Sequence, residues 1–400
     1  MQNRRFLVAT LASILLTATA CEQGTTHPPA GQNVNSQPNP SNPAVSSQKN
    51  NGTFTPPKTL SIKEAWKDVK VTTFDAILPD GRAWGPLAIG EAGEIVGGVP
   101  VQKPVTKAYE LILYNTKTGN HESIATLGKD SQAIWASLND RWIVWSESLD
   151  QTFVNWKMHA YDRINKKDSI VATSASEKNG RGFDGPIWMP SLYGDEFVWS
   201  PSEGPIDEKG MQVVVKKYNL KTGELTELAK RAGNPVLTQN FALWIGRDDE
   251  TNDGALFWNK GNRIQQLTKG KTVGYVASDG ESIVWSGLQN SQRWELWMIT
   301  PNGEHRQLLA KEPENAIEFL SIGSRVIALR TYDKIQVYDR KLDSIVILQD
   351  EDAAYSQPIA NNHYLIWNTP IPKTEEERKQ AKQNGIYPSR IHLIDLNSLP

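Results

Sequence analysis

Short apolar segments that end in tryptophan recur along most of the chain. Five copies share one form: Trp-Ile-Val-Trp at 142–145, Glu-Phe-Val-Trp at 196–199, Phe-Ala-Leu-Trp at 241–244, Ser-Ile-Val-Trp at 282–285 and Tyr-Leu-Ile-Trp at 364–367. Two degenerate copies, at 94–97 and 326–329, fit the same frame. From position 97 to position 367 the copies cover 270 residues in six steps, an average of 45. A period of this length with several short strands per unit is typical of a β-propeller.

Each unit continues with the same order of apolar and polar positions. A loop leads to a second alternating strand, which ends in tyrosine followed by Asn or Asp at 114–115, 161–162, 218–219 and 338–339. An Asn or Asp side chain accepts hydrogen bonds from nearby backbone amides, so these positions predict tight turns into an outer strand. With an apolar segment before each tryptophan strand, the pattern predicts four strands per unit.

The last unit lacks an outer strand, because the chain ends at the alternating segment 391–396. Residues 70–78 precede the first unit and also alternate. We expect them to form the missing outer strand, because this pairing removes two exposed sheet edges. The sequence therefore predicts an all-β fold over residues 58–400, a seven-bladed β-propeller closed by an N-terminal strand. A six-bladed ring is the alternative, if the copy at 315–349 or the first copy is irregular.

The tryptophans that end these strands need a structural explanation, because the chain has 14 tryptophans and only 9 phenylalanines. A large flat side chain at this position can fill the wedge between two blades and bury about 150–250 Å². We therefore expect five of them to be core residues rather than ligand-stacking residues: Trp145, Trp199, Trp244, Trp285 and Trp367.

The first residues have the plan of a signal peptide. Arg4 and Arg5 precede an apolar run over 6–16, and small residues lead to Cys21, the only cysteine in the chain. This segment resembles the bacterial lipoprotein signal, which implies cleavage after residue 20 and lipid attachment to Cys21. That resemblance predicts a protein anchored by lipid in the cell membrane, on its extracytoplasmic face. An ordinary secreted protein with an incidental cysteine is the alternative.

The segment that follows is rich in Pro, Asn, Gln, Ser and Gly and has almost no charge. Such a composition cannot bury enough apolar surface to offset chain entropy, so we expect residues 21–57 to be a disordered linker. A flexible chain of this length reaches roughly 30–36 Å, which suits a tether between membrane and propeller.

One unit matches a known repeat in particular. Residues 278–309 contain Asp279-Gly280, the apolar strand to Trp285, Leu296-Trp297 and the turn Asn302-Gly303. This order resembles the WD40-like repeat of TolB-type propellers. The resemblance implies the propeller architecture and does not assign a function. The Gly-x-Ser-x-Gly motif of hydrolase domains in related propeller peptidases does not occur in the sequence.

Composition excludes several classes of protein. Lys and Arg number 43 against 45 Asp and Glu, a net charge of −2, whereas nucleic-acid binders need a basic surface. One cysteine excludes a disulfide scaffold and a zinc site built from several cysteines. No Gly-rich phosphate loop occurs, and no cofactor is predicted. The six histidines are scattered, and turn or surface positions are expected for them.

Two sets of residues are candidates for ligand binding. Asp248, Asp249 and Asp253 lie in an acidic loop whose oxygens suit calcium, although its spacing departs from a calcium-binding loop and also fits a hairpin turn. Trp156 and Trp294 begin third strands near the end of the ring that carries the longest loops. They are candidates for stacking on sugar rings, with partial burial as the alternative.

Four carboxylates are candidates for catalysis at the centre of the ring: Asp184, Asp195, Glu318 and Asp352. A retaining glycosidase needs two carboxyl groups about 5–5.5 Å apart, which a sequence cannot establish.

The function predicted first is a membrane-anchored binding or scaffold propeller without catalysis, whose partner is an envelope protein or polysaccharide. A polysaccharide hydrolase or lyase and an envelope-sensing signalling module are the alternatives. The lining of the central channel distinguishes them, because carboxylates or histidines there favour an enzyme and apolar residues favour a scaffold.

Overall fold

The structure is a computed structural model. It describes residues 54–102, 109–128, 130–150, 155–174, 189–202, 213–248, 250–261, 263–332, 334–349, 357–371, 374–377, 379 and 388–400. The described residues belong to one compact unit, Phe54–Pro400. The predicted signal peptide, Cys21 and most of the predicted linker lie outside the described residues.

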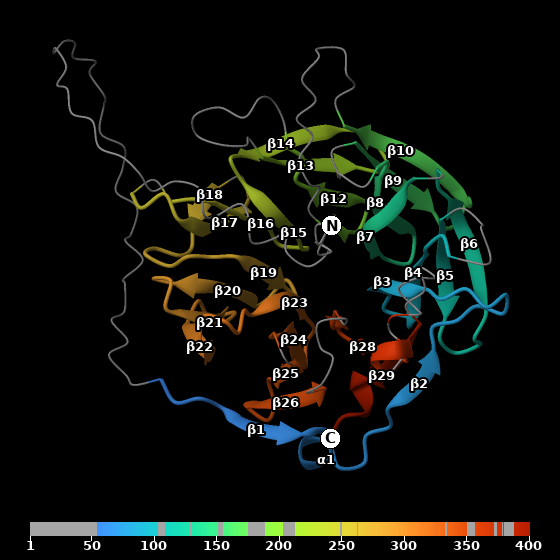
Figure 1. Cartoon of the computed structure of the whole chain (residues 1–400). Coiled ribbons are helices and arrows are strands. Elements are labelled where there is room, and N and C mark those ends of the chain that lie inside the picture. Colours follow the sequence, from blue (N-terminus) through green and yellow to red (C-terminus); the bar gives the residue numbers. More distant parts are fainter. Residues whose placement is uncertain are drawn as a thin grey trace, which may run out of the picture. The chain divides into compact units, whose positions relative to one another are not determined.

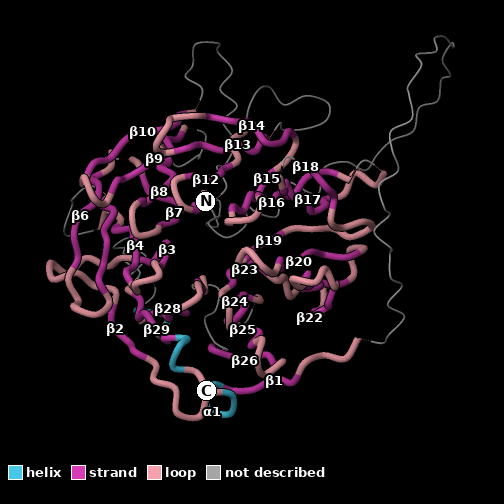
Figure 2. The backbone as a smooth tube through the Cα atoms, turned by 180° about the vertical axis from the view of Figure 1, so that it is seen from behind, coloured by secondary structure: helices cyan, strands magenta, loops and turns pink. Residues whose placement is uncertain are grey.

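The described residues form seven sheets arranged in a ring (Figure 1). In each blade the first strand lies towards the centre and the later strands lie towards the rim, as both views show (Figure 2). The prediction of seven blades is confirmed. The six-bladed alternative is wrong, because the copies at 94–97 and 326–329 both belong to complete sheets.

The strands have the following bounds. Blade 1 is β3 (Gly85–Ile89), β4 (Glu94–Val99), β5 (Glu110–Asn115) and β6 (His121–Thr126); blade 2 is β7 (Gln132–Leu138), β8 (Trp142–Ser148), β9 (Trp156–Asp162) and β10 (Lys167–Thr173). Blade 3 is β11 (Ser191–Tyr193), β12 (Glu196–Trp199), β13 (Val214–Asn219) and β14 (Leu225–Lys230); blade 4 is β15 (Gly233–Leu237), β16 (Ala242–Arg247), β17 (Gly254–Lys260) and β18 (Arg263–Gln266). Blade 5 is β19 (Tyr275–Ser278), β20 (Ile283–Gln289), β21 (Arg293–Ile299) and β22 (His305–Lys311). Blade 6 is β23 (Glu318–Ile322), β24 (Val326–Arg330), β25 (Ile335–Asp339), β26 (Ser344–Gln349) and β1 (Lys58–Ser61); blade 7 is β27 (Ile359–Ala360), β28 (Tyr364–Pro370), β29 (Ser389–Asp395) and β2 (Thr72–Asp75).

The N-terminal strand β2 closes the ring as the sequence predicts. It pairs antiparallel with β29, with Thr72 opposite Leu393 and Asp75 opposite Arg390. The Phe74 ring stacks on Tyr114 of blade 1, with ring centroids 5.2 Å apart. The same strand therefore completes the last blade and contacts the first.

The sequence does not predict the role of the preceding strand. β1 adds to blade 6 as a fifth strand, parallel to β26, with Lys58 opposite Ser344. The short helix α1 (Ile62–Ala65) follows, and the buried Trp66 donates a hydrogen bond from Nε1 to the Asp339 carboxylate at 2.7 Å. Residues 58–75 thus form an arm that pairs with two neighbouring blades.

The tryptophans that end the second strands are core residues, which confirms that prediction. Each of the five is at most 2 % exposed. Trp145, for example, packs in a cluster that includes Val96 of blade 1 and Ile143 of blade 2. Opposite three of these indoles the third strand carries another ring, in the stacked pairs Trp145–His159, Trp285–Trp297 and Trp367–His392.

The predicted turns are also present. The Asn115 and Asn219 side chains each accept hydrogen bonds from the amides two and three residues later, and Asp162 and Asp339 do the same. Among the described residues, no helix has the length and apolar character needed to cross a bilayer.

Candidate functional site

The antiparallel order of the strands gives the ring two different ends. Turns between first and second strands and between third and fourth strands lie at one end, the Asx-turn face. Connections between second and third strands, and between successive blades, lie at the other end, the long-loop face. The four longest connections are at 100–109, 174–190, 200–213 and 371–388; that at 174–190 joins blade 2 to blade 3, and the other three join second to third strands.

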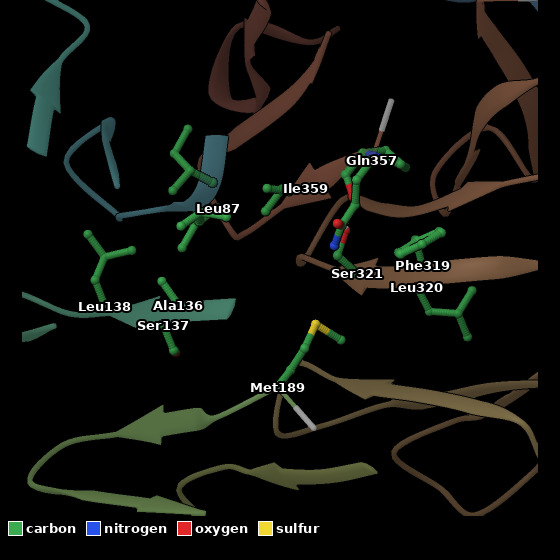
Figure 3. A pocket seen from close by; sticks show the side chains of 13 residues that line it. Leu87, Ala136, Ser137, Leu138, Met189, Phe319, Leu320, Ser321, Gln357 and Ile359 are labelled. Carbon is green, nitrogen blue, oxygen red and sulfur yellow. Dashed lines mark hydrogen bonds between the residues drawn. The ribbon is translucent and has the colours of Figure 1, made fainter. Parts of the chain in front are cut away.

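The channel cavity lies among the inner strands and has a volume of about 190 Å³. Its lining comes from four blades and from the segments that precede β11 and β27: Leu87, Ala88, Ile89, Ala136, Ser137, Leu138, Met189, Phe319, Leu320, Ser321, Gln357, Pro358 and Ile359. Figure 3 shows the Met189 side chain and the Gln357 side chain extending towards the middle from opposite sides. These lining residues are far apart in sequence, and the ring brings them together.

One lining residue has an unusual backbone conformation. Phe319 has φ 54°, the left-handed region that bulky side chains rarely adopt. It lies where the pairing of β23 with β24 shifts register between Glu318 and Ser321. The Arg330 guanidinium lies over the Phe319 ring, 4.3 Å from its centroid, and pairs with Glu318 at 2.7 Å. The bulge and this ion pair hold the Phe319 ring beside the channel cavity.

Three lining residues supply neutral polar side chains. Ser321 Oγ accepts a hydrogen bond from the Ala360 amide at 2.9 Å and lies 3.3 Å from the Pro358 carbonyl. Within the described part of the chain, the Ser137 hydroxyl and the Gln357 carboxamide have no hydrogen-bond partner. The polar groups of the cavity are therefore two half-buried side chains without partners and one serine that joins blades 6 and 7.

The described lining holds no Asp, Glu, His, Lys or Arg. General acid–base catalysis needs a titratable side chain within hydrogen-bond reach of the substrate, and the described lining supplies none. Nor do the described residues contain a group of three or more His, Cys, Asp and Glu side chains placed to hold a metal ion.

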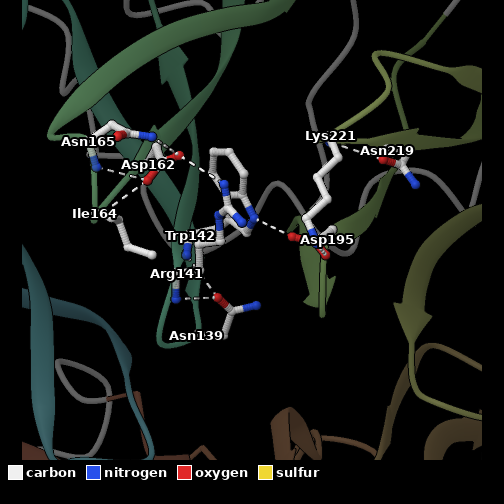
Figure 4. A network of polar contacts seen from close by, with 9 residues as sticks. All are labelled: Asn139, Arg141, Trp142, Asp162, Ile164, Asn165, Asp195, Asn219 and Lys221. Atoms are coloured by element: carbon white, nitrogen blue, oxygen red, sulfur yellow. Dashed lines mark hydrogen bonds and ion pairs between the residues drawn. The ribbon is translucent and has the colours of Figure 1, made fainter.

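The two described candidate carboxylates, Glu318 and Asp195, lie at opposite ends of the ring. Glu318 begins an inner strand at the long-loop face and pairs with Arg330. Asp195 lies in the β11–β12 turn on the Asx-turn face, where Lys221 and the Trp142 Nε1 group bind it at 2.6 and 2.9 Å (Figure 4). These contacts, that of Lys221 first, lower the pKa of Asp195. Asp184 and Asp352 lie outside the described residues.

The two candidate stacking tryptophans have different surroundings. Trp156 is 3 % exposed and packs in the cluster of Met158, Phe197 and Trp199, so its ring faces are covered. Trp294 is half-buried, donates from Nε1 to the Pro313 carbonyl at 3.2 Å and lies 6.4 Å from the Tyr275 ring.

In the acidic loop, Asp248 acts as a turn residue. Its carboxylate accepts hydrogen bonds from the amides of Glu250 and Thr251 and from the Gln266 side chain. These contacts, the Thr251 amide first, lower the pKa of Asp248. The Asp253 amide donates to Thr251 Oγ1 at 3.3 Å, and Asp249 lies outside the described residues.

A buried charged cluster in blade 2 was not predicted. His159 is 6 % exposed, and its two ring nitrogens each lie 2.9 Å from a carboxylate, Glu147 on one side and Asp168 on the other. Burial opposes protonation of His159, but the hydrogen bonds to Asp168 and Glu147 outweigh it and raise its pKa. The expectation of a turn or surface position is therefore wrong for this residue, because two acceptors offset the cost of burying it.

Comparison with known proteins shows the fold. No family model and no curated protein matches the sequence. An oligogalacturonate lyase from Vibrio parahaemolyticus superposes with a TM-score of 0.54 at 11% identity, over 82% of this chain and 98% of that one. An acylaminoacyl peptidase from Pyrococcus horikoshii gives 0.53 at 10% identity, over 72% of this chain and 49% of that one, so the match spans about half of the peptidase.

TolB from Acinetobacter baumannii is also among the similar structures, with a TM-score of 0.44 and 13% identity over 65% of each chain. The superpositions on the lyase and the peptidase show that the chain has the propeller fold.

Proposed function

We propose that the protein is a non-catalytic binding or scaffold propeller, held at the extracytoplasmic face of the cell membrane by lipid on Cys21. The observation that carries this proposal is that the described lining of the channel cavity is uncharged and mainly apolar. Among the described lining residues, Ser137 and Ser321 alone carry a hydroxyl group, and none of the others is a base. Such a lining suits the binding of an apolar group and lacks the groups that catalysis needs.

The anchor is argued from the sequence. The only cysteine follows an apolar run and small residues, at the position that lipid attachment requires. Two lipid chains on Cys21 would give stable anchoring, and the linker would hold the ring away from the bilayer. The Cys21→Ala variant should move from the membrane fraction to the soluble or medium fraction. Retention of that variant in the membrane would contradict the anchor.

The partner is proposed to be an envelope protein or an envelope polysaccharide, with no role for nucleic acid. The long-loop face supports this because the longest connections lie there, together with Met189 and Gln357 of the cavity lining. Loops carried by a rigid scaffold are the usual place for binding residues.

A polysaccharide hydrolase or lyase is the second candidate. The observation in its favour is the superposition with oligogalacturonate lyase, which covers 98% of that enzyme. A lyase would release an unsaturated uronate that absorbs ultraviolet light, and a hydrolase would release new reducing ends. Incubation with polygalacturonate should produce neither. Turnover that is lost in Glu318→Gln would contradict the non-catalytic proposal.

A further inference from the structure

We propose that the channel cavity binds one neutral aromatic ring that carries a single hydrogen-bonding substituent. This inference rests on the binding function proposed above and names the chemistry that the site would select.

Volume limits the size of the ligand. The cavity measures about 190 Å³. An apolar cavity of about 150 Å³ is known to admit benzene, whereas sites for drug-sized ligands run from about 300 to 1,000 Å³. One substituted ring therefore fits the space.

The lining selects an uncharged aromatic group. A charged ligand would lose its hydration without gaining an ion pair from the described lining, none of whose residues is charged. The Met189 thioether extends into the cavity (Figure 3), and thioethers make favourable contacts with aromatic rings. Phe319 offers a second ring, held at the cavity by its bulge and by Arg330.

The two polar side chains without partners account for the substituent. The Gln357 carboxamide and the Ser137 hydroxyl are half-buried, and a purely apolar ligand would remove them from water without replacing the lost hydrogen bonds. A phenol hydroxyl or an amide on the ring would satisfy one of them.

The strain at Phe319 is an independent observation. A bulky residue at positive φ costs free energy, and such strain persists where the surrounding structure imposes it, often at binding sites. Here the strained backbone carries a ring that lines the cavity. The strained backbone at Phe319 thus has a function, because it places the Phe319 ring at the channel cavity.

Ligand-observed NMR titration of the full chain with p-cresol and with toluene tests the proposal. We expect p-cresol to bind about 3- to 10-fold more tightly than toluene, the value of one hydrogen bond. Gln357→Leu should remove that difference and leave toluene binding intact. Ser137→Phe fills the cavity and should abolish both signals. If Ser137→Phe does not fold, Met189→Ala takes its place and should weaken the binding of both probes.

Tyr332→Ala is the matched control, because Tyr332 is 75% exposed on the long-loop face and does not line the cavity. Its replacement should leave binding unchanged. N-acetyltyrosine amide distinguishes a ring carried by a protein chain from a free small molecule: tighter binding than p-cresol indicates the former and weaker binding the latter.

Three results would overturn the proposal: no binding of either probe at millimolar concentration, equal binding of p-cresol and cyclohexanol, or binding that survives both Ser137→Phe and Met189→Ala unchanged. The proposed function fails separately, if a captured partner is chemically converted. If the protein binds p-cresol but converts its captured partner, only the proposed function is refuted. If the captured partner stays unconverted and neither probe binds, only the proposed ligand class is refuted.

Discussion

At the scale of single residues, flat side chains at equivalent positions hold the blades together. Three of the recurring tryptophans stack on a ring in the next strand, and the type of ring differs between blades. The pairs are Trp145–His159, Trp285–Trp297 and Trp367–His392. The recurring tryptophans were visible in the sequence because they end similar apolar segments. Their stacking partners were not, because the loops between the strands differ in length and hide the equivalence.

Trp285 tests the core assignment. It is 1% exposed, and its Nε1 group is buried without a hydrogen-bond partner in the described structure. Trp285→Ala should lower the free energy of unfolding by about 3–5 kcal/mol because it leaves a cavity. Trp285→Phe, the matched control, should cost less than about 2 kcal/mol, because part of the volume is kept and no hydrogen bond is lost. Urea unfolding followed by circular dichroism measures both, and equal losses would contradict this account.

His159 makes stability depend on pH. Its pKa is raised above the ordinary 6.5, so its contribution is complete below that pH and is lost as pH rises through the folded-state pKa. Burial opposes ionisation of Glu147, yet the His159 hydrogen bond and others lower its pKa below 4.5, so its contribution is complete above that value. The pair should therefore stabilise most between pH 4.5 and 6.5.

Chemical denaturation across this range compares the wild type with His159→Gln. The stability difference should be largest in that window and should shrink at alkaline pH. His121→Gln, at an exposed position in β6, should produce no such profile. A difference for His159→Gln that stays constant with pH would show that only its packing matters.

At the scale of elements, the N-terminal arm joins the chain's beginning to two blades. The alternation of residues 70–78 and the missing outer strand allowed β2 to be predicted. β1 could not be predicted, because a four-residue parallel strand leaves no alternation to recognise and its partner β26 already completes a four-stranded sheet. The joint between arm and ring is Trp66 with the buried Asp339, which Arg325 also binds at 2.9 Å.

A double-mutant cycle on Trp66→Phe and Asp339→Asn tests this joint. Trp66→Phe keeps most of the packing and removes one hydrogen bond to a charged group, so it should cost about 1.5–3 kcal/mol. In a protein that already carries Asp339→Asn, Trp66→Phe should lower the free energy of unfolding by at least about 0.5 kcal/mol less than it does in the wild type. Hydrogen exchange should show faster opening of β1 than of β2 in the variants. Additive costs would mean that the contact contributes no stability.

At the scale of the whole molecule, ring closure creates a site that no segment contains. Phe319, Gln357 and Met189 come from different parts of the chain and meet only in the closed ring. The sequence predicted the blades from their period, but the cavity depends on a register shift and a positive φ at Phe319 that no residue pattern reveals. Of the carboxylates suggested from sequence, the described ones, Asp195 and Glu318, lie at opposite ends of the ring, because a first strand begins at one end and turns into the second strand at the other.

The central claim is binding without turnover. Its most direct test is to isolate the full-length protein with its bound partner from detergent-solubilised envelope and to measure the partner's mass before and after prolonged incubation. The account predicts a saturable complex whose partner keeps its mass and is lost when Ser137→Phe fills the cavity. A captured glycan or peptide that is cleaved during incubation would contradict it.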